Sequence, residues 1–213
     1  MQRAIIDPAG FETKFRENSD PWNYAASPFE AYKRAVLLHA CGTRPLGRGL
    51  ELACAIGETT RMLAPRCLRL LAVDSSATAL KEAARRTTGH RKITLRLALL
   101  PQQMPRGPFD LIVVSELLYY LRPNDLRSLI SLIPRALAPG GRVVILHHLQ
   151  DFNDAAVRPR FAQRSVVAAF HCRMPLARLV NAGRFEAAAL VKRSRPLGPG
   201  ATKLSTRMWG ART

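Results

Sequence analysis

Residues 49–57 read Gly-Leu-Glu-Leu-Ala-Cys-Ala-Ile-Gly, and a second apolar segment ends in Asp74, seventeen residues after Gly57. Small residues after a strand let the backbone approach a ligand, and an acid that ends the next strand accepts hydrogen bonds from ribose hydroxyls. The spacing therefore predicts a site for a nucleoside-type cofactor at the carboxyl ends of two neighbouring strands.

The loop departs from the glycine-rich form, which would read Glu-x-Gly-x-Gly-x-Gly. This chain has Glu51-x-Ala53-x-Ala55-x-Gly57. A methyl group disfavours positive φ, so we expect conventional backbone angles at both alanines and a narrower approach to the ligand. This change lowers the expected affinity without excluding binding.

The elements that must position these residues alternate along the chain. Continuous apolar strands separated by amphipathic helices predict a parallel sheet covered on both faces. We expect one Rossmann-like, doubly wound α/β domain with a mostly parallel seven-stranded sheet, one antiparallel C-terminal strand and helices on both faces. The predicted strands are 49–53, 68–74, 93–98, 109–115, 142–147, 185–191 and 202–209. The predicted helices are 28–41, 58–64, 77–88, 123–137, 161–170 and 176–182, with tight turns at 138–141 and 197–200.

The N-terminal part differs in character from this alternating core. Residues 1–26 are polar and read as irregular, with an aromatic turn at 20–24. Ser27-Pro28 is a helix start, and Glu30 completes a capping box. We therefore divide the single domain 1–213 into an N-terminal cap segment and helix at 1–42, a cofactor-binding core at 43–148, and a C-terminal, substrate-facing completion of the sheet at 149–213.

The composition is that of an ordinary globular chain except for its charge. Of 213 residues, 47% are hydrophobic and 23% charged, and the formal net charge is +18. One interpretation of this charge is a surface for nucleic acid or another polyanion. The other is a solvated basic surface that follows from a bias toward arginine, and the absence of an aromatic-plus-basic RNA-binding pattern favours it.

The cysteines and the chain's N-terminus give no sign of a metal site or of membrane association. The four cysteines are scattered without a paired motif, which predicts buried free thiols and no metal. No apolar run reaches the length of a membrane span, and no signal peptide is evident at the start of this sequence. We expect a cytoplasmic protein without a membrane partner; its oligomeric state stays open.

Three segments together resemble class I S-adenosylmethionine-dependent methyltransferases. They are the loop at 51–57, Asp74, and Phe-Asp-Leu-Ile-Val-Val-Ser-Glu at 109–116 followed by Leu-Ala-Pro-Gly-Gly at 137–141. The segments at 20–30, 63–67 and 116–121 resemble more narrowly the nodulation protein S family, whose members N-methylate the free amine of a deacetylated chitooligosaccharide. The resemblance covers roughly residues 10–148 and implies S-adenosyl-L-methionine as cofactor.

The resemblance also implies where the cofactor is held. The loop would surround the methionine portion, Glu51 would meet its amino group, and Asp74 would accept both ribose hydroxyls. The aromatic turn and the Ser27-capped helix would close over the cofactor, with Lys33 reaching its carboxylate. Relatives usually carry an aspartate for the adenine amino group where this chain has Leu99, so apolar contact and backbone groups, for example at 98–100, would have to hold adenine here. The full candidate set is Trp22, Tyr24, Ser27, Lys33, Glu51, Ala53, Cys54, Gly57, Asp74, Ser75, Leu99, Leu100 and Ser115.

Candidate catalytic residues lie where the fourth and fifth strands end, since ligands bind at the carboxyl ends of such sheets. Glu116 would attract an amine, Tyr119 and Tyr120 would stack on a sugar or line the methyl path, and His147 would act as base, with His148 on the alternate face. Methyl transfer itself requires mainly positioning and exclusion of water.

Four functions remain open at this point. The first is methylation of an amine on a small molecule or oligosaccharide. The second is methylation of RNA or another polyanion through the basic C-terminal third. The third is a non-catalytic cofactor-binding protein, which the alanines in the loop and Leu99 allow. The fourth is a nicotinamide oxidoreductase, which Pro139-Gly-Gly141 and the Glu-anchored loop disfavour.

Overall fold

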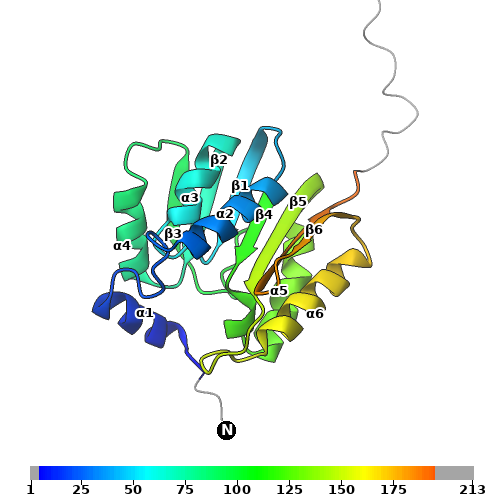
Figure 1. Cartoon of the computed structure of the whole chain (residues 1–213). Helices are drawn as coiled ribbons and strands as arrows, with labels where there is room; N and C mark the ends of the chain where they lie inside the picture. The colour runs from blue at the N-terminus through cyan, green and yellow to red at the C-terminus, as the bar shows by residue number, and fades with distance from the viewer. Residues whose placement is uncertain (1–4, 195–213) are drawn as a thin grey trace, which may run out of the picture.

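The computed structural model describes residues 5–194, which form one sheet with helices around it (Figure 1). The sheet has seven strands in the order β3-β2-β1-β4-β5-β7-β6. The strands are β1 Leu46–Leu52, β2 Cys67–Asp74, β3 Ile93–Leu97, β4 Phe109–Ser115, β5 Leu137–His148, β6 Leu176–Asn181 and β7 Phe185–Val191. The helices are α1 Pro8–Glu17, α2 Pro28–Ala40, α3 Glu58–Leu63, α4 Ala77–Arg86, α5 Pro123–Ala136 and α6 Pro159–His171, with 3₁₀ turns η1 Ala64–Arg66 and η2 Leu118–Tyr120.

The predicted fold class is confirmed. Strands β1 to β5 pair in parallel, and β7 is antiparallel to both of its neighbours, β5 and β6. The chain order along the sheet reverses between β1 and β4. The loops that leave the carboxyl ends of these two neighbouring strands therefore run to opposite faces of the sheet, which opens a crevice between them. In open α/β sheets ligands bind in this crevice, and here it is also where the cofactor residues were predicted.

The two faces of the sheet are covered by different helices. Leu37 of α2 and Leu63 of α3 pack on Val113 and Leu146, in a cluster on one face. The helices α5 and α6 cover the other face, where Leu129 and Phe170 belong to a larger cluster with Val114. In Figure 1, α2 and α3 cross in front of the sheet and α1 lies below α4. Alternate strand residues thus point toward different helix layers.

The prediction of an irregular N-terminal segment is wrong, because residues 8–17 form helix α1. Asp7 caps it by accepting a hydrogen bond from the Gly10 N–H at 2.8 Å, and Pro8 occupies the first turn. This Asp-Pro pair is the same kind of start signal as Ser27-Pro28. The Glu12 carboxylate fixes α1 to the start of α4, since it accepts hydrogen bonds from the Ser76 and Thr78 hydroxyls at 2.7 and 2.6 Å.

The predicted helix at 176–182 is also wrong, because these residues form strand β6 and the turn after it. Gly183 has φ +74° and reverses the chain into β7, and its N–H donates to the Asn181 side chain at 2.9 Å. A glycine after a short apolar segment fits a helix end and a hairpin equally well. Here the segment forms a hairpin because it can pair with the open row of backbone hydrogen-bonding groups at the edge of β7.

The remaining differences are smaller. The turn at 138–141 lies inside β5, where the register with β4 shifts between Phe109 and Leu111. Cys41, Cys54 and Cys67 are buried free thiols as predicted, whereas Cys172 is exposed. The predicted turn at 197–200 and strand at 202–209 lie outside the described residues. Within residues 5–194, no helix has the length and apolar character needed to cross a membrane.

Candidate functional site

A pocket at the carboxyl ends of β1, β2 and β4 contains most of the predicted cofactor residues. We call it the central pocket, and α1 and α2 supply its outer walls. The predicted residues that line it are Trp22, Tyr24, Lys33, Glu51, Ala53, Cys54, Asp74, Ser75, Ser115, Glu116 and Tyr120. A second pocket is lined by Leu99 and Leu100 and shares Asp74 and Tyr120 with the first, so the two pockets adjoin.

Four candidate residues line neither pocket: Ser27, Gly57, Tyr119 and His147. Ser27 caps α2, and its hydroxyl accepts from the Glu30 N–H at 3.3 Å. The reciprocal half of the predicted capping box is not formed, because the Ser27 N–H donates to the Asn23 carbonyl at 3.1 Å. Gly57 begins α3 at φ +80°, where a Cβ would lie 3.0 Å from the Cβ of Ala83. Both residues shape the pocket walls from outside.

The backbone of the loop contradicts the expectation for its two alanines. Ala53 has φ +56° and Ala55 has φ +47°, so both keep the left-handed conformation natural to glycine. Hydrogen bonds hold the loop there: the Ala55 N–H donates to Asp74 Oδ2 at 2.8 Å, and the Cys54 N–H donates to the Val73 carbonyl at 3.0 Å. The loop shape therefore survives substitution, at a cost of about 1–2 kcal/mol per alanine.

Backbone strain in the described residues concentrates at this site. The non-glycine residues with positive φ are Asn23, Ala53, Ala55 and Glu116. Three of them line the central pocket, and Asn23 lies between the pocket residues Trp22 and Tyr24. Such conformations persist where surrounding contacts enforce them, and they are typical of ligand sites.

The two acids of the cofactor half are buried and differently held. Asp74 accepts N–H groups from Ala55 at 2.8 Å and Ser76 at 2.9 Å, one on each carboxylate oxygen. Burial raises the pKa of Asp74, and these backbone N–H groups oppose the rise. Glu51 accepts the Thr60 hydroxyl at 2.6 Å, and burial raises the pKa of Glu51 to about 8. With this pKa, the Glu51 carboxyl is mostly protonated at pH 7.

At the other end of the pocket, Lys33 and Glu116 form a buried ion pair of 2.5 Å between Nζ and Oε1. Lys33 also contacts Glu30 at 3.0 Å, and the Tyr119 hydroxyl donates to Glu116 Oε2. Burial raises the pKa of Glu116, but the Lys33 ammonium, His147 and the Tyr119 hydroxyl together outweigh it, so that this pKa lies below its usual range. Burial likewise lowers the pKa of Lys33, but the two glutamates outweigh it and raise it. Glu116 is therefore ionised and paired with Lys33, and the Lys33 ammonium is held by Glu116 and Glu30.

Arg34, the neighbour of Lys33, is the cation with open hydrogen-bonding capacity in the central pocket. Its NH1 group donates to the Tyr24 carbonyl at 2.6 Å. Arg34 is only 9% exposed, and its Nε has no hydrogen-bond partner in the described part of the chain. A buried donor without a partner is costly, so this N–H is a candidate to bind a ligand group or a water molecule. Sequence reasoning missed Arg34 because it considered only Lys33.

The prediction of His147 as a base is wrong. Its Nε2 accepts the N–H groups of Leu117 and Leu118 at 3.1 Å each, and its Nδ1 pairs with Gln163 Oε1 at 2.9 Å. Both ring nitrogens are therefore used, and the side chain is fully buried. Burial lowers the pKa of His147 to about 4. The histidine is a neutral support that fixes the turn after β4, which carries Glu116 and Tyr120.

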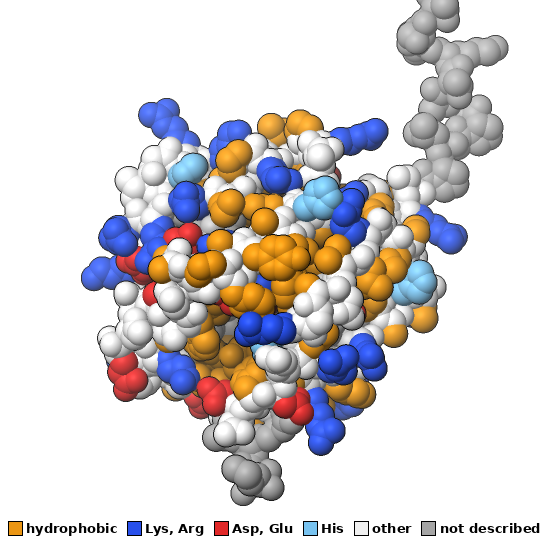
Figure 2. All heavy atoms as spheres, viewed as in Figure 1, with side chains coloured by type: hydrophobic (Ala, Val, Ile, Leu, Met, Phe, Trp, Pro, Cys, Tyr) orange, Lys and Arg blue, Asp and Glu red, His pale blue; other side chains and the backbone are white. Residues whose placement is uncertain are grey.

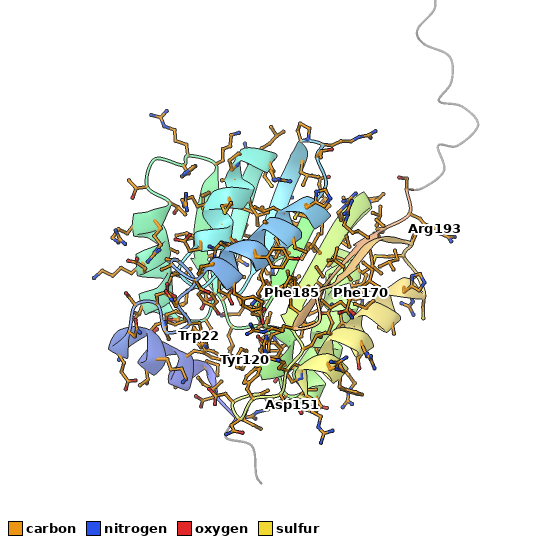
Figure 3. All side chains as sticks on the ribbon, in the orientation of Figure 1. Trp22, Tyr120, Asp151, Phe170, Phe185 and Arg193 are labelled. Atoms are coloured by element: carbon orange, nitrogen blue, oxygen red, sulfur yellow. The ribbon has the colours of Figure 1, made fainter. Side chains whose placement is uncertain are left out.

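Helix α1 supplies aromatic residues that sequence reasoning missed. Phe11 and Phe15 line the central pocket. The Phe11 ring lies 4.8 Å from the Tyr120 ring and 6.0 Å from the Trp22 ring. Figure 3 shows Trp22 and Tyr120, from segments far apart in the chain, at the same end of the sheet. The missed signal was the Asp7-Pro8 start of the helix.

The charge of the central pocket is opposite to that of the whole chain. Five acids and two bases line it: Glu30, Glu51, Glu58, Asp74 and Glu116 against Lys33 and Arg34. On the outer face in Figure 2, lysine and arginine side chains are scattered rather than gathered in one patch. Glu51 is mostly protonated and Glu58 pairs with Arg61 and Arg86. The ionised groups that remain are Glu30, Asp74 and Glu116 against Lys33 and Arg34, a small surplus of negative charge that favours cationic ligands.

The sheet order, the loop–Asp74 constellation and the pocket at the strand ends define a class I S-adenosylmethionine-dependent methyltransferase fold. The family model described as "Nodulation protein S (NodS)" matches residues 12–154. The chain belongs to this family.

Individual relatives agree with the family assignment. Nodulation protein S of Rhizobium tropici is 37% identical over 127 residues, which cover 59% of this chain and 53% of the relative. The protein of that name from Sinorhizobium fredii is 34% identical over 127 residues, with 59% of each covered. The chain thus spans little more than half the length of these curated relatives.

Among solved structures, the N-methyltransferase NodS from Bradyrhizobium japonicum WM9, in complex with S-adenosyl-L-homocysteine, is similar at a TM-score of 0.76 and 27% identity. The similarity covers 88% of this chain and 99% of that one. The fold found here is therefore that of a protein solved with a cofactor product.

Proposed function

We propose that this chain transfers a methyl group from S-adenosyl-L-methionine to an amine of a small molecule or amino-oligosaccharide, such as a deacetylated chitooligosaccharide. The observation that carries the proposal is the acidic central pocket inside a chain of net charge +18. The cofactor is cationic at its sulfonium and amino groups, and an amine acceptor is cationic before it loses a proton. A polyanion would meet surplus acid at this pocket, so methylation of RNA is not favoured.

The cofactor half supports this proposal through groups that match a nucleoside with an amino-acid tail. S-Adenosylmethionine supplies a methyl group on a positively charged sulfur. Each Asp74 oxygen accepts one backbone N–H and keeps lone pairs for a ribose hydroxyl. The pocket around Leu99 and Leu100 offers apolar contact to adenine, and it also contains Asp125, which accepts the Gln102 amide at 3.1 Å.

The amino-acid tail has a binding group for each charge. In this proposal Glu51 meets the amino group and Arg34, not Lys33, meets the carboxylate. The support for Arg34 is its buried, unpaired Nε beside a wall of the pocket. Trp22, Tyr24, Ala53, Cys54, Ser75 and Ser115 would contact the ligand from the pocket surface, whereas Ser27 and Gly57 act only by shaping the elements behind it.

The acceptor half is built from Glu116, Tyr120 and their supports. Glu116 is ionised and would orient an incoming aminium alongside Lys33, while Tyr119 fixes the carboxylate by its hydrogen bond. Tyr120 would present its ring toward a sugar face. Burying these groups excludes water and fixes the reacting atoms, which is the main contribution of the protein to a methyl transfer.

Two measurements test the proposal in sequence. Calorimetric titration with S-adenosyl-L-homocysteine should give a dissociation constant below 1 mM, which corresponds to a binding free energy of roughly −4 kcal/mol or stronger. If no heat is measured at sub-millimolar ligand, the proposed methyltransferase activity is excluded. Mass spectrometry should then show one added methyl group on a glucosamine oligomer incubated with S-adenosyl-L-methionine. The fully N-acetylated oligomer is the matched control and should stay unmodified. Cofactor binding without transfer to any amine would leave the polyanion methyltransferase and the non-catalytic cofactor-binding protein as alternatives.

A further inference from the structure

His148 is the last residue of β5 and stands on the opposite face of the sheet from His147. Alternation along a strand puts its side chain on the same face as Leu146, which lines the central pocket. The His148 N–H donates to Glu116 Oε2 at 3.3 Å, so the residue is fixed directly beside the acid of the acceptor half. The two adjacent histidines therefore have different environments.

The imidazole ring of His148 is half-buried and keeps open lone-pair capacity. In the described part of the chain no group hydrogen-bonds to either of its nitrogens, in contrast to both nitrogens of His147. Its one ring contact is with Phe152, at 6.4 Å between centroids, and Phe152 in turn packs on Tyr120 at 5.8 Å. The ring thus packs through Phe152 against Tyr120, which lines the central pocket, while His148 itself stands just outside the pocket lining.

We propose that His148 is the proton acceptor for the amine that this enzyme methylates. The inference rests on the proposed function, because it assumes an amine acceptor. Glu116 and Lys33 neutralise each other in a buried pair, and His147 has no free lone pair. Among the described residues beside Glu116, His148 remains as a basic group that is partly exposed and whose ring nitrogens have no hydrogen-bond partner.

The proposed step balances as follows. A lone pair on the His148 imidazole takes one proton from the aminium, which leaves a neutral amine and an imidazolium. The freed nitrogen pair forms the new N–C bond while the C–S bond breaks, and sulfur keeps that electron pair. The imidazolium then gives its proton to water, so that one proton is released for each methyl group transferred.

The charged groups around His148 are compatible with this role. Glu30 and Lys33 face it from α2, Glu116 from the end of β4 and Arg184 from the turn before β7. Burial lowers the pKa of His148; Glu116 opposes this, while Lys33 and Arg184 add to it. The net direction is downward, so the ring is neutral at pH 7 and able to accept a proton.

The test compares His148→Asn with His171→Asn, since His171 is exposed at the end of α6. We expect His148→Asn to lower kcat/KM toward a glucosamine oligomer at pH 7 by about 100-fold, within the usual range for a lost general base. Affinity for S-adenosyl-L-homocysteine should change less than twofold, and His171→Asn should match wild type. Raising the pH to the region where the free amine is neutral should restore most of the variant's activity.

A second readout does not depend on turnover. In ¹³C-histidine NMR, the resonance that disappears in His148→Asn should titrate with a pKa below the usual histidine value, and Glu116→Gln should lower it further by removing a negative charge. Wild-type kcat/KM and wild-type pH dependence in His148→Asn would overturn the base. If wild-type protein binds the cofactor product but methylates no amine, the proposed function fails instead, and the base with it.

Discussion

The central pocket and the outer surface of this molecule have opposite charge. The chain carries 33 lysines and arginines against 15 acids, yet five of those acids and only two bases line the pocket. The surface cations are scattered in Figure 2 and have water around them, whereas the pocket acids are held by hydrogen bonds to neighbouring side chains and backbone. The net charge of this protein therefore reflects its solvated exterior, whereas the charge of its ligand is better inferred from the residues that line the pocket.

The strongest test of this contrast is Asp74→Ala. The substitution removes the acceptor proposed for the ribose, and we expect affinity for S-adenosyl-L-homocysteine to fall 10- to 100-fold, about the contribution of two charge-assisted hydrogen bonds. Isothermal titration calorimetry measures the change. Asp110→Asn removes an acid at the opposite end of the sheet, where it accepts the Arg48 N–H, and should leave the affinity unchanged. Equal affinities for the two variants would show that the ribose lies elsewhere.

Arg34→Gln tests the one pocket cation with an unpaired nitrogen. Loss of a charge-assisted contact should weaken S-adenosyl-L-homocysteine about tenfold. The ligand 5′-methylthioadenosine has the same nucleoside but no amino-acid carboxylate, so its affinity should change less than twofold. A parallel loss for both ligands would mean that Arg34 only supports the fold.

Glu51 tests whether a pocket acid changes its protonation when a cationic group arrives. The pKa of Glu51 is raised to about 8 by burial, so the carboxyl is mostly protonated at pH 7. A ligand aminium beside it lowers this pKa, and the complex then holds fewer protons than the free protein. Binding should therefore release close to one proton at pH 7, and affinity should rise with pH up to about 8.

Calorimetry in buffers of different ionisation enthalpy counts that proton. Glu51→Gln should abolish the release while keeping the hydrogen bond from Thr60 possible. Proton release that is the same in wild type and variant would assign it to another group.

The smallest expected effect concerns the strained loop. Ala53→Gly relieves a left-handed alanine, and we expect it to raise the free energy of unfolding by about 0.5–1 kcal/mol, because the gain exceeds the entropy cost of glycine. Ala84→Gly in the exposed last turn of α4 should have the opposite sign, by up to about 1 kcal/mol. Urea denaturation measures both. Destabilisation by Ala53→Gly would show that the loop carries no strain.

The sequence was sufficient for features that depend on local pattern. The strand ending in Asp74, the fourth strand and the seven-stranded class followed from apolar periodicity and turn residues, and the structure confirms them. The misread segments have a physical cause. The segment 176–181 became a strand because the edge of β7 offered hydrogen bonds, which no window of sequence contains.

The positions of candidate site residues were predictable where the ends of strands place them. They were less predictable where other side chains hydrogen-bond or pair with the same polar atoms. Asp74 and Glu51 lie where strand ends place them. His147 was misjudged because Gln163, distant in sequence, occupies its Nδ1. The pairing of Lys33 with Glu116 could not be foreseen either, because the two residues are far apart in the chain. Alternation along β5 could have distinguished the two histidines, but only with knowledge of which helix covers each face.

Helix α1 has a consequence for the timing of any reaction in this pocket. It is held by Glu12 at one point and by an exposed ion pair of 3.6 Å between Lys14 and Asp154 at another, and Phe15 is its one buried residue. It nevertheless supplies two rings to the wall of the pocket. Segments with few buried contacts open at the lowest free energy. We therefore expect the departure of α1, with the sheet beneath it intact, to set the residence time of a bound product.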